Sequence, residues 1–347
     1  MKGRGAQFNA HNRFEQLRYD ASDADGLDEP HELGARTEVI SVHPKKLLNK
    51  VPSPDIPLNW SMNPYQGCEH GCIYCYARES HNYWGYSAGL DFERKILVKA
   101  NAPKLLDKEL RKKSWQAEPI MLSGNTDCYQ PVERKLGITR QLLEVCLKFK
   151  QSVGVITKNS LLLRDVDIFS ELAASNLVQV VLSITTLDEA LRQVLEPRTA
   201  SAKKRVAAIE ELTAAGIPTM VMMAPIIPGL TSHEIPALLK AAAEAGAFSA
   251  SYTMLRLNGQ VADLFVDWVQ QTYPDRANKI LNHVAAAHGG KLGDHRFGAR
   301  MRGEGHMAEN IRDLFKLHKK LNFGTGSGPC FNRDAFRLPE EGQLRLF

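Results

Sequence analysis

Short apolar runs alternate with amphipathic segments along the middle of the chain. The apolar runs have the length of strands and cover residues 58–63, 120–123, 153–157, 178–185, 219–224 and 249–255. The segments between them carry apolar residues at helical spacing, over residues 132–149, 164–175, 202–215 and 234–245. This alternation is typical of βαβ units with a parallel sheet, whose strands are covered on both faces and read as nearly continuous apolar runs.

The ends of these segments carry residues that typically begin and end helices. Asp165 precedes one apolar-periodic run, and Gly216 follows another, with Pro218 two residues later. The six βα units are fewer than the eight of a closed barrel. We therefore expect an open, partial (β/α)6 barrel, with a doubly wound sheet as the alternative.

The flanks of this region have different patterns. Residues 1–56 are polar, mix charge signs and contain clusters of Gly and Pro, which predicts an arm that is poorly ordered or packed on the barrel. Residues 57–257 form the predicted barrel. Residues 258–347 have only helical periodicity, which predicts a mainly helical C-terminal extension packed against the open barrel. Its expected helices cover residues 261–273, 276–288 and 304–321.

The composition is that of an ordinary soluble chain. Hydrophobic residues make up 44% and charged residues 24% of the 347 residues, enough for one large α/β domain with appendages. No stretch reaches the roughly 18 apolar residues of a membrane span, and the first residues lack the apolar centre of a secretory signal. These features predict a cytoplasmic protein with no membrane partner.

Three of the six cysteines, Cys68, Cys72 and Cys75, lie close together in the sequence. Small secreted domains distribute their cysteines along the chain, whereas a tight cluster in a long chain is typical of a metal or catalytic site with reduced thiols. The C-x3-C-x2-C motif comes just after the first predicted strand. Because loops after the strands of a parallel sheet form its functional face, the motif lies where a ligand would bind.

Three thiolates suit a 4Fe-4S cluster with one open iron, because Cys72 and Cys75 lie about one helical turn apart and Cys68 can lie in the loop before them. Gly67 and Gly71 are expected to relieve crowding where the backbone wraps around the cluster. The amino and carboxylate groups of S-adenosylmethionine suit the open iron. A reduced cluster could pass one electron to the sulfonium and release a 5′-deoxyadenosyl radical that abstracts hydrogen.

A structural zinc site is the alternative use of these thiols. Such a site takes four ligands, and His70, His81 and Cys128 are candidates for the fourth. Zinc sites usually show two paired C-x2-C halves, and the second half is missing from this sequence. The cluster is therefore the favoured interpretation.

The cysteine motif, with Tyr74 before its third cysteine and six βα units after it, resembles the radical S-adenosylmethionine (radical SAM) superfamily, whose core is a partial TIM barrel. More narrowly, the chain resembles the spore photoproduct lyase-like group, often labelled DNA repair photolyases, in the segments GCEHGCIYCYAR, GNTDCYQPVERKLGITR, TK at 157–158, LEPRT and MAPIIPGL. The resemblance covers about residues 62–255. It implies a 4Fe-4S cluster and S-adenosylmethionine as cofactors, and a reducing partner such as flavodoxin or ferredoxin.

The resemblance implies roles for residues of the motif itself. Cys68, Cys72 and Cys75 match the cluster ligands, and Tyr74 matches the residue that lies along the adenine. Tyr76 matches the second of the two tyrosines that flank the third cysteine in spore photoproduct lyase.

Further contacts to S-adenosylmethionine are implied at the carboxyl ends of later strands. The residues with this implied role are Gly124, Asn125 and Thr126 for the methionine amino group, Ser183 and Thr185 for the ribose or carboxylate, Lys158 and Arg198 for the carboxylate, and Ile226 in the adenine-side loop. Each alone has a plainer explanation, as a polar strand face or a surface charge. Together, at the ends of consecutive strands, they are better explained by one shared ligand.

The chain departs from spore photoproduct lyase at the hydrogen-donating cysteine. The lyase carries that cysteine at the end of the second strand, where residues 123–124 offer no thiol here, and Cys128 follows four or five residues later. Repair of thymine photoproducts therefore cannot be inherited from the resemblance. Asp127 and Tyr129 make the loop polar, so a buried thiol is less natural at Cys128 than at Cys146. Hydrogen donation by Cys128 is a hypothesis beside an inert loop cysteine.

Two functions remain open at this point. The first is a radical SAM enzyme, a lyase of the spore photoproduct lyase-like group, that abstracts hydrogen from an unknown substrate, with a nucleic-acid lesion in DNA as the first candidate. The second is a nucleic-acid-binding protein whose metal only stabilises the fold, without catalysis. From Lys291 onward there are 11 Lys and Arg and 7 Asp and Glu, which is compatible with contact with nucleic acid, although a solvated surface is the commoner explanation. The aromatic residues within 83–86 could stack on bases or form a packed loop.

Overall fold

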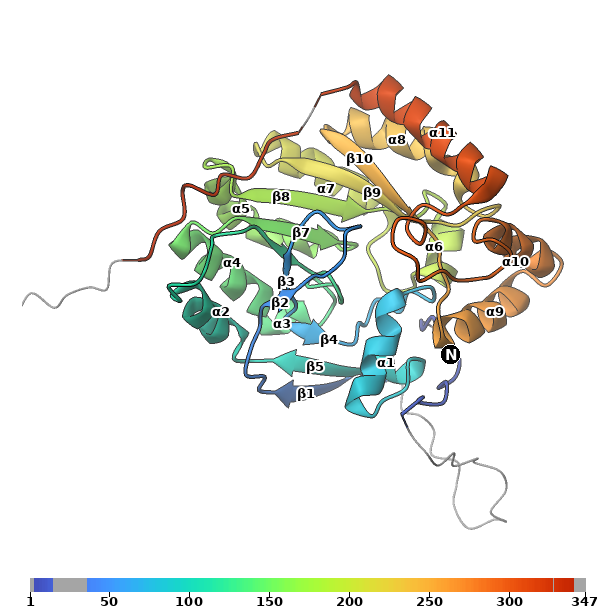
Figure 1. The fold of residues 1–347 in the computed structure, drawn as a ribbon, viewed down its shortest axis with the longest axis horizontal. Coiled ribbons are helices and arrows are strands. Elements are labelled where there is room, and N and C mark those ends of the chain that lie inside the picture. The colour runs from blue at the N-terminus through green and yellow to red at the C-terminus, as the bar shows by residue number, and fades with distance from the viewer. Residues whose placement is uncertain (1–2, 15–35, 327, 340–347) are drawn as a thin grey trace, which may run out of the picture.

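A curved seven-stranded sheet forms the centre of the computed structural model, which describes residues 3–14, 36–326 and 328–339 (Figure 1). The strand order is β10-β9-β8-β7-β6-β3-β2. Neighbours from β10 to β3 pair in parallel, and β2 pairs antiparallel with β3. The bounds are β2 (Asn49–Lys50), β3 (Trp60–Met62), β6 (Ile120–Leu122), β7 (Val153–Thr157), β8 (Val178–Ser183), β9 (Thr219–Ile226) and β10 (Ser249–Met254).

The six predicted strands are all present in this sheet, although most of their ends differ. β8 ends at Ser183, so Thr185 lies just beyond it, and β9 continues to Ile226. From β3 to β10 the strands follow one another in chain order without the reversal of a doubly wound sheet, and the first and last strands do not pair. The sheet therefore forms an open, partial barrel, as predicted.

A second, three-stranded sheet was not predicted. It has the order β1-β5-β4, with β1 (Glu38–Val42) parallel to β5 (Lys95–Lys99) and β4 (Tyr65–Gln66) antiparallel to it. β1 and the buried Leu47 belong to the polar N-terminal region. The described parts of that region thus pack against the barrel.

Helices that follow the strands pack side by side around the sheet (Figure 1). Their apolar faces and the sheet enclose the main hydrophobic core. The helices of this layer are α2 (Ala102–Leu110), α3 (Glu133–Leu136), α4 (Ile138–Phe149), α5 (Val166–Ala173), α7 (Ala202–Ala214) and α8 (Ile235–Glu244). Shorter elements at the loops are the 3-10 helices η1 (Tyr76–Trp84), η2 (Ser160–Asp165) and η3 (Ser232–Glu234), with α1 (Leu90–Arg94) and α6 (Glu189–Leu195).

The predicted helix over residues 132–149 is two helices. Gly137 has a φ of 62°, in the left-handed region, and separates α3 from α4. A residue in this conformation cannot continue a right-handed helix, and glycine adopts it without the steric cost of a side chain. The prediction of one continuous helix is therefore wrong at Gly137.

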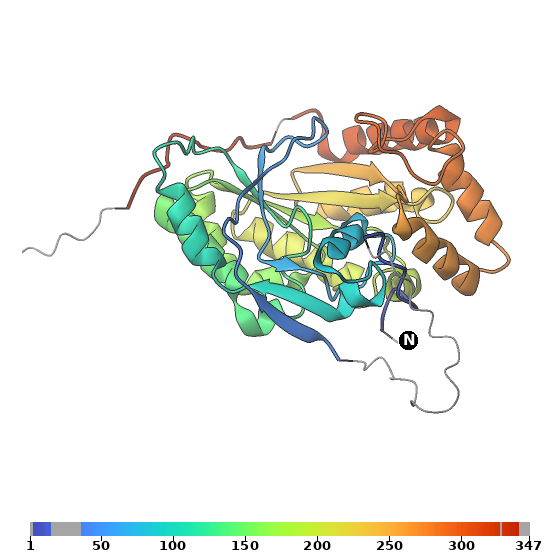
Figure 2. The ribbon, with the colours of Figure 1, turned by 60° about the horizontal axis from the view of Figure 1, so that its bottom comes forward.

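Three helices form the C-terminal extension, as the periodicity predicted: α9 (Gln260–Thr272), α10 (Ala277–Ala286) and α11 (Gly305–Phe323). Figure 2 shows them gathered at one end of the sheet. α9 and α10 share a second hydrophobic core with Ile73 and Tyr74 of the cysteine motif, so these two helices of the extension pack against the motif. None of the helices in the described part of the chain combines the length and apolarity that a membrane crossing needs.

Candidate functional site

The three motif cysteines lie in the loop between β4 and η1. Cys68 and Cys72 are buried, Cys75 is partly buried, and all three are free thiols. Burial raises the pKa of each thiol. For Cys68, the charges of Asp127, Cys72 and Cys75 raise the pKa further. Bound iron is the kind of positive charge that would offset both effects and keep the thiolates ionised.

The glycines of this loop are required, but for a reason other than the one expected. Gly67 and Gly71 have φ values of 76° and 67°. A Cβ on Gly67 would lie 2.8 Å from the Lys95 carbonyl oxygen, and one on Gly71 would lie 2.8 Å from Glu93 Oε2. The missing side chains therefore let the loop pack against α1 and β5.

A buried ion pair between Arg78 and Glu93 holds the cysteine loop in place. Arg78 donates through Nε to the Cys72 carbonyl oxygen at 3.0 Å and through Nη2 to that of Gly71 at 3.2 Å. Its Nη2 pairs with Glu93 Oε1 at 2.5 Å, and both side chains are fully buried. The Glu93 carboxylate also accepts the backbone N–H of Gly5 at 3.1 Å and of Ala6 at 2.8 Å. The N-terminal residues and the cysteine loop are thus joined through one carboxylate.

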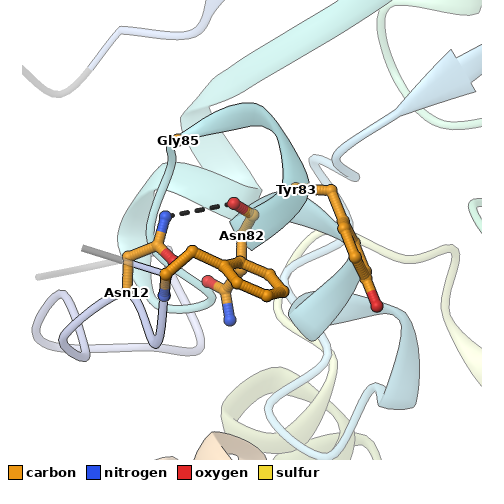
Figure 3. Close-up of a pocket in the computed structure, with 5 residues that line it drawn as sticks. Asn12, Asn82, Tyr83 and Gly85 are labelled. Atoms are coloured by element: carbon orange, nitrogen blue, oxygen red, sulfur yellow. Dashed lines mark hydrogen bonds between the residues drawn. The ribbon is translucent and has the colours of Figure 1, made fainter. Parts of the chain in front are cut away.

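Residues 3–14 continue from this contact along η1. The Asn12 side-chain amide donates to the Asn82 carbonyl oxygen at 3.1 Å (Figure 3). Around this bond lies a surface pocket of about 280 Å³, lined by Asn12, Phe14, Asn82, Tyr83 and Gly85. None of the residues predicted to contact the cofactor lines this pocket.

Lys158 follows β7 and lies among the ends of the neighbouring strands. Its Nζ donates to Ser183 Oγ at 2.8 Å, Thr185 Oγ1 at 3.1 Å and the Ala224 carbonyl oxygen at 2.9 Å. It also lies 3.1 Å from Glu196 Oε1 in an ion pair. The structure therefore brings together three of the predicted cofactor residues, but the ammonium donors of Lys158 are all used within the chain.

Tyr74 joins the same group of side chains from the cysteine motif. It is buried, and its hydroxyl donates to Glu196 Oε1 and lies 3.1 Å from Thr185 Oγ1. Lys158 Nζ lies 5.6 Å from the centre of its ring. Burial and the Glu196 charge raise the pKa of Tyr74 well above its usual value, so the hydroxyl stays a hydrogen-bond donor.

Glu196 is the centre of this network, and the sequence analysis did not assign it. The carboxylate is fully buried and pairs with Arg205 Nη2 at 2.8 Å as well as with Lys158. Burial opposes its ionisation, but the charges of Lys158 and Arg205 outweigh burial and lower its pKa. The signal lies within LEPRT, in which Arg198 is the predicted cofactor residue and Glu196 stands two residues before it.

Asp127 is a second residue that the sequence analysis left without a role. Its Oδ2 accepts the backbone N–H of Lys158 at 2.8 Å and lies 3.3 Å from His70 Nδ1. Burial opposes its ionisation, but His70 and the hydrogen bonds that it accepts lower its pKa. Asp127 therefore joins the cysteine loop to the end of β7.

The loop after β6 presents a different pattern from the expected one. Asn63 Oδ1 accepts the backbone N–H groups of Asn125 at 2.9 Å and of Thr126 at 3.3 Å. The Gly124 carbonyl oxygen accepts a hydrogen bond from the Tyr76 hydroxyl at 2.5 Å. These main-chain groups lie beside the motif, but they are engaged by side chains of the chain itself.

Arg198 and Ile226 lie outside the network around Lys158. The Arg198 guanidinium is partly exposed and lies 3.4 Å from Glu69 Oε1, while its backbone N–H donates to the His70 carbonyl oxygen at 3.2 Å. Ile226 is fully buried in the main core, and its carbonyl oxygen accepts the N–H of Leu255 at 2.9 Å. Contact of either side chain with the cofactor stays a prediction.

Cys128 lies in the main hydrophobic core and is fully buried. Its backbone N–H donates to Ser123 Oγ at 2.9 Å, and its carbonyl oxygen accepts from Thr139 Oγ1 at 2.7 Å. The expectation that a buried thiol is unnatural here is wrong, because the polar neighbour Asp127 points to Lys158 while Cys128 turns into the core. Hydrogen donation by Cys128 stays a hypothesis.

The residues present fit a cluster better than zinc. Among the residues of the described ranges, no three or more His, Cys, Asp and Glu side chains, the motif cysteines included, are gathered around one point, so the comparison of cluster and zinc rests on the chemistry of the donors. His70 uses both ring nitrogens, towards Asp127 at 3.3 Å and Asn159 at 3.2 Å, and Cys128 lies in the core. His81, the third candidate, is buried between Tyr86 and Phe92, and neither of its ring nitrogens has a hydrogen-bond partner among the described residues. Three soft thiol ligands match a cubane with one open iron.

The sequence model of the radical SAM superfamily matches residues 62–242, more than half of the chain. The chain belongs to this superfamily. An uncharacterized protein of Mycobacterium tuberculosis is 33% identical over 238 residues, which are 68% of this chain and 70% of that protein. An uncharacterized protein of Methanocaldococcus jannaschii is 29% identical over 254 residues, 73% of this chain and 90% of that protein. The superfamily implies S-adenosylmethionine and an iron–sulfur cluster as cofactors.

Solved structures of spore photoproduct lyase have the same fold. The lyase complexed with dinucleoside spore photoproduct superposes with a TM-score of 0.60 at 15% identity, covering 82% of this chain and 80% of the lyase. A lyase variant with bound AdoMet and dinucleoside spore photoproduct has a TM-score of 0.57 over the same shares. At this identity the likeness establishes the open barrel, and it leaves the reaction to other arguments.

Proposed function

We propose that the chain is a radical SAM enzyme that acts on a nucleic-acid lesion, as a lyase of the spore photoproduct lyase-like group. The observation that carries the proposal is that the cysteine loop adjoins the polar network at the strand ends. Tyr74, between Cys72 and Cys75, donates its hydroxyl hydrogen bond to Glu196 Oε1, and the Ile73 backbone N–H donates to the Leu195 carbonyl oxygen at 3.2 Å. A ligand of the thiol-bound cluster would therefore reach this network directly.

Cys68, Cys72 and Cys75 would hold the 4Fe-4S cluster, with S-adenosylmethionine beside it. When bound, the pair supplies one-electron cleavage of a carbon–sulfur bond and a 5′-deoxyadenosyl radical for hydrogen abstraction. The chain contributes polar groups in fixed positions, because Glu196 and Lys158 orient the hydroxyls of Tyr74 and Thr185. Helices α9 and α10, packed behind the motif, keep water from that side.

Reconstitution under anaerobic conditions with iron and sulfide tests the proposal. We expect a brown protein that forms 5′-deoxyadenosine from S-adenosylmethionine after chemical reduction. Cys72→Ala is expected to lose the cluster, because two thiolates do not hold a cubane in competition with solvent. Cys146→Ala is the matched control, since Cys146 lies on α4 in the main core, and it should keep full iron and sulfide. A colourless wild-type protein that retains zinc would contradict the proposal.

The second candidate is nucleic-acid binding without catalysis, and one surface favours it. Tyr83 is 71% exposed and Phe14 is 54% exposed, with their rings 5.0 Å apart. The Arg13 guanidinium lies 4.9 Å from the centre of the Phe14 ring. Such a surface can stack on bases. Absence of 5′-deoxyadenosine from a reconstituted, reduced protein that still binds nucleic acid would support this candidate.

A further inference from the structure

Arg256, just after β10, has a guanidinium without an acidic partner. Its Nη1 lies 2.7 Å from Met301 Sδ, and its Cζ lies 5.5 Å from the centre of the Tyr76 ring. Within the described ranges no carboxylate forms an ion pair with it. A partly buried cation whose hydrogen-bond and ring contacts within the described ranges are a thioether and an aromatic ring keeps donors for an anion.

Asp55, the acid whose charge acts on Arg256, is already paired with another arginine. Asp55 pairs with Arg300 Nε at 2.6 Å and accepts the backbone N–H of Gly298 at 2.7 Å. Arg300 also donates to Ser53 Oγ at 2.6 Å. Burial lowers the pKa of Arg256, and the charge of Arg300 lowers it further, so the two guanidinium groups act on one another. Two cations and one carboxylate leave this surface with an excess positive charge.

The surface is fixed beside the cysteine loop. Tyr76 directly follows Cys75, is 57% exposed, and is held by the hydrogen bond from its hydroxyl to the Gly124 carbonyl oxygen. The loop of residues 291–304 is tied to the end of β10, since the Met254 N–H donates to the Met301 carbonyl oxygen at 2.9 Å. A group bound at Arg256 would therefore lie next to the proposed cluster.

We propose that Arg256, with the Tyr76 ring and Arg300 beside it, is an anion subsite that holds a phosphodiester group of the substrate strand. The fork of guanidinium donors matches two phosphate oxygens, and the exposed part of the Tyr76 ring offers a face to the adjoining base. This subsite rests on the proposed function, because it places the nucleic-acid substrate at the carboxyl ends of the β-strands, where the radical would form. A purely structural Arg256 would leave nucleic-acid affinity unchanged when replaced.

Binding of a short, fluorescein-labelled, single-stranded oligothymidylate to the reconstituted protein tests the subsite. Arg256→Met is expected to weaken the dissociation constant by about 10- to 100-fold, the loss for one charge-assisted contact. The slope of log affinity against log salt should become shallower by about 1. Arg256→Lys should recover part of the affinity and the full slope, because it keeps the charge and loses the fork.

Arg302→Met is the matched control, because Arg302 is an exposed arginine of the neighbouring loop of residues 291–304. Its affinity should stay within about twofold of wild type. Iron content and circular dichroism establish that each variant is folded; if Arg256→Met fails to fold, the loss of affinity in Arg256→Lys carries the test. Wild-type affinity in the folded Arg256 variants would overturn the subsite, as would a wild-type protein that does not bind the oligonucleotide. Formation of 5′-deoxyadenosine by the wild-type protein, measured separately, tests the proposed function alone.

Discussion

At the scale of single residues, the site depends on carboxylates that are buried and paired. Glu196, Asp127 and Glu93 each accept hydrogen bonds from two or more separate segments. A buried carboxylate is stable only with such partners, and removing one member leaves the other charges uncompensated. The positions of the residues predicted to contact the cofactor therefore depend on buried acids that need not contact the cofactor themselves.

Glu196→Gln should show this dependence. The substitution removes the charge that faces Lys158 and Arg205, and it should lower the free energy of unfolding by about 3 to 5 kcal/mol. Glu244→Gln is the control, because Glu244 and its partner Lys240 are both exposed on α8, where the expected loss is below about 1 kcal/mol. Urea unfolding measures both variants. Equal losses in the two variants would show that Glu196 does not hold the network.

His81 predicts a pH dependence of stability. Burial lowers the pKa of His81 to about 4, below the usual value of 6.5, so the unfolded chain binds the proton more readily. Stability contributed by the neutral ring is complete above pH 6.5 and is lost as the pH falls towards 4. Between pH 7 and pH 5 the loss should be about 2 kcal/mol. His81→Asn should lack this component in urea unfolding, and an unchanged pH dependence would contradict the assignment.

Three of the predicted cofactor residues, which the structure brings together, share a simple geometry. Lys158, Ser183 and Thr185 lie at or just past the carboxyl ends of β7 and β8, and such ends are neighbours in any parallel sheet. Glu196 follows α6 in a segment without periodicity, so its direction could not be inferred. Cys128 was misjudged because polarity of its neighbours does not fix the direction of its own side chain.

At the scale of elements, the chain's longest apolar runs were predictable and its short pairings were not. β4 has two residues and gains its strand identity only by pairing with β5. β1 pairs with β5 although more than fifty residues separate Glu38 from its partner Lys95. Such pairings depend on tertiary packing rather than local pattern. The break between α3 and α4 is the opposite case, since it depends on one residue.

Gly137→Ala should isolate that single-residue effect. The Cβ would meet no atom within 4 Å, so the φ of 62° alone opposes alanine. The expected loss in the free energy of unfolding is about 1 to 2 kcal/mol. Gly137→Asn should lose less, because asparagine tolerates this conformation better. Thermal or urea unfolding measures both variants. Conformational strain predicts a larger loss of stability for Gly137→Ala, whereas a packing effect would give the larger loss to Gly137→Asn, which has the bigger side chain.

At the scale of the whole molecule, segments far apart in sequence meet at the cysteine loop. Residues 3–14 lie against the loop and η1, and α9 and α10 share a hydrophobic core with Ala6 and with Ile73 and Tyr74 of the loop. The loop is thus held in part by segments from both ends of the chain. Cluster stability should therefore respond to changes in segments that contribute no ligand.

Gly5→Ala is the sharpest test of that dependence. A Cβ on Gly5 would lie 1.8 Å from the Gly71 carbonyl oxygen, and Gly71 lies next to Cys72. The N-terminal segment must therefore move away from the loop, which costs about 1 to 3 kcal/mol as in other overpacked sites. Because Arg78 binds both the loop carbonyls and the Glu93 carboxylate that holds Gly5, the displacement should loosen the cluster ligands. We expect iron to pass to an external chelator about 5- to 100-fold faster, measured by the absorbance of the iron–chelator complex.

Gly326→Ala provides the comparison for this last experiment, because its Cβ would meet no atom within 4 Å and its φ is not in the left-handed region. It should release iron at the wild-type rate. Glu93→Gln should accelerate release as Gly5→Ala does, since the amide cannot replace the charge that Arg78 faces. Equal release rates in Gly5→Ala and Gly326→Ala would mean that the N-terminal segment only covers the loop. Acceleration in both Gly5→Ala and Glu93→Gln would make this segment part of the structure that retains the cluster.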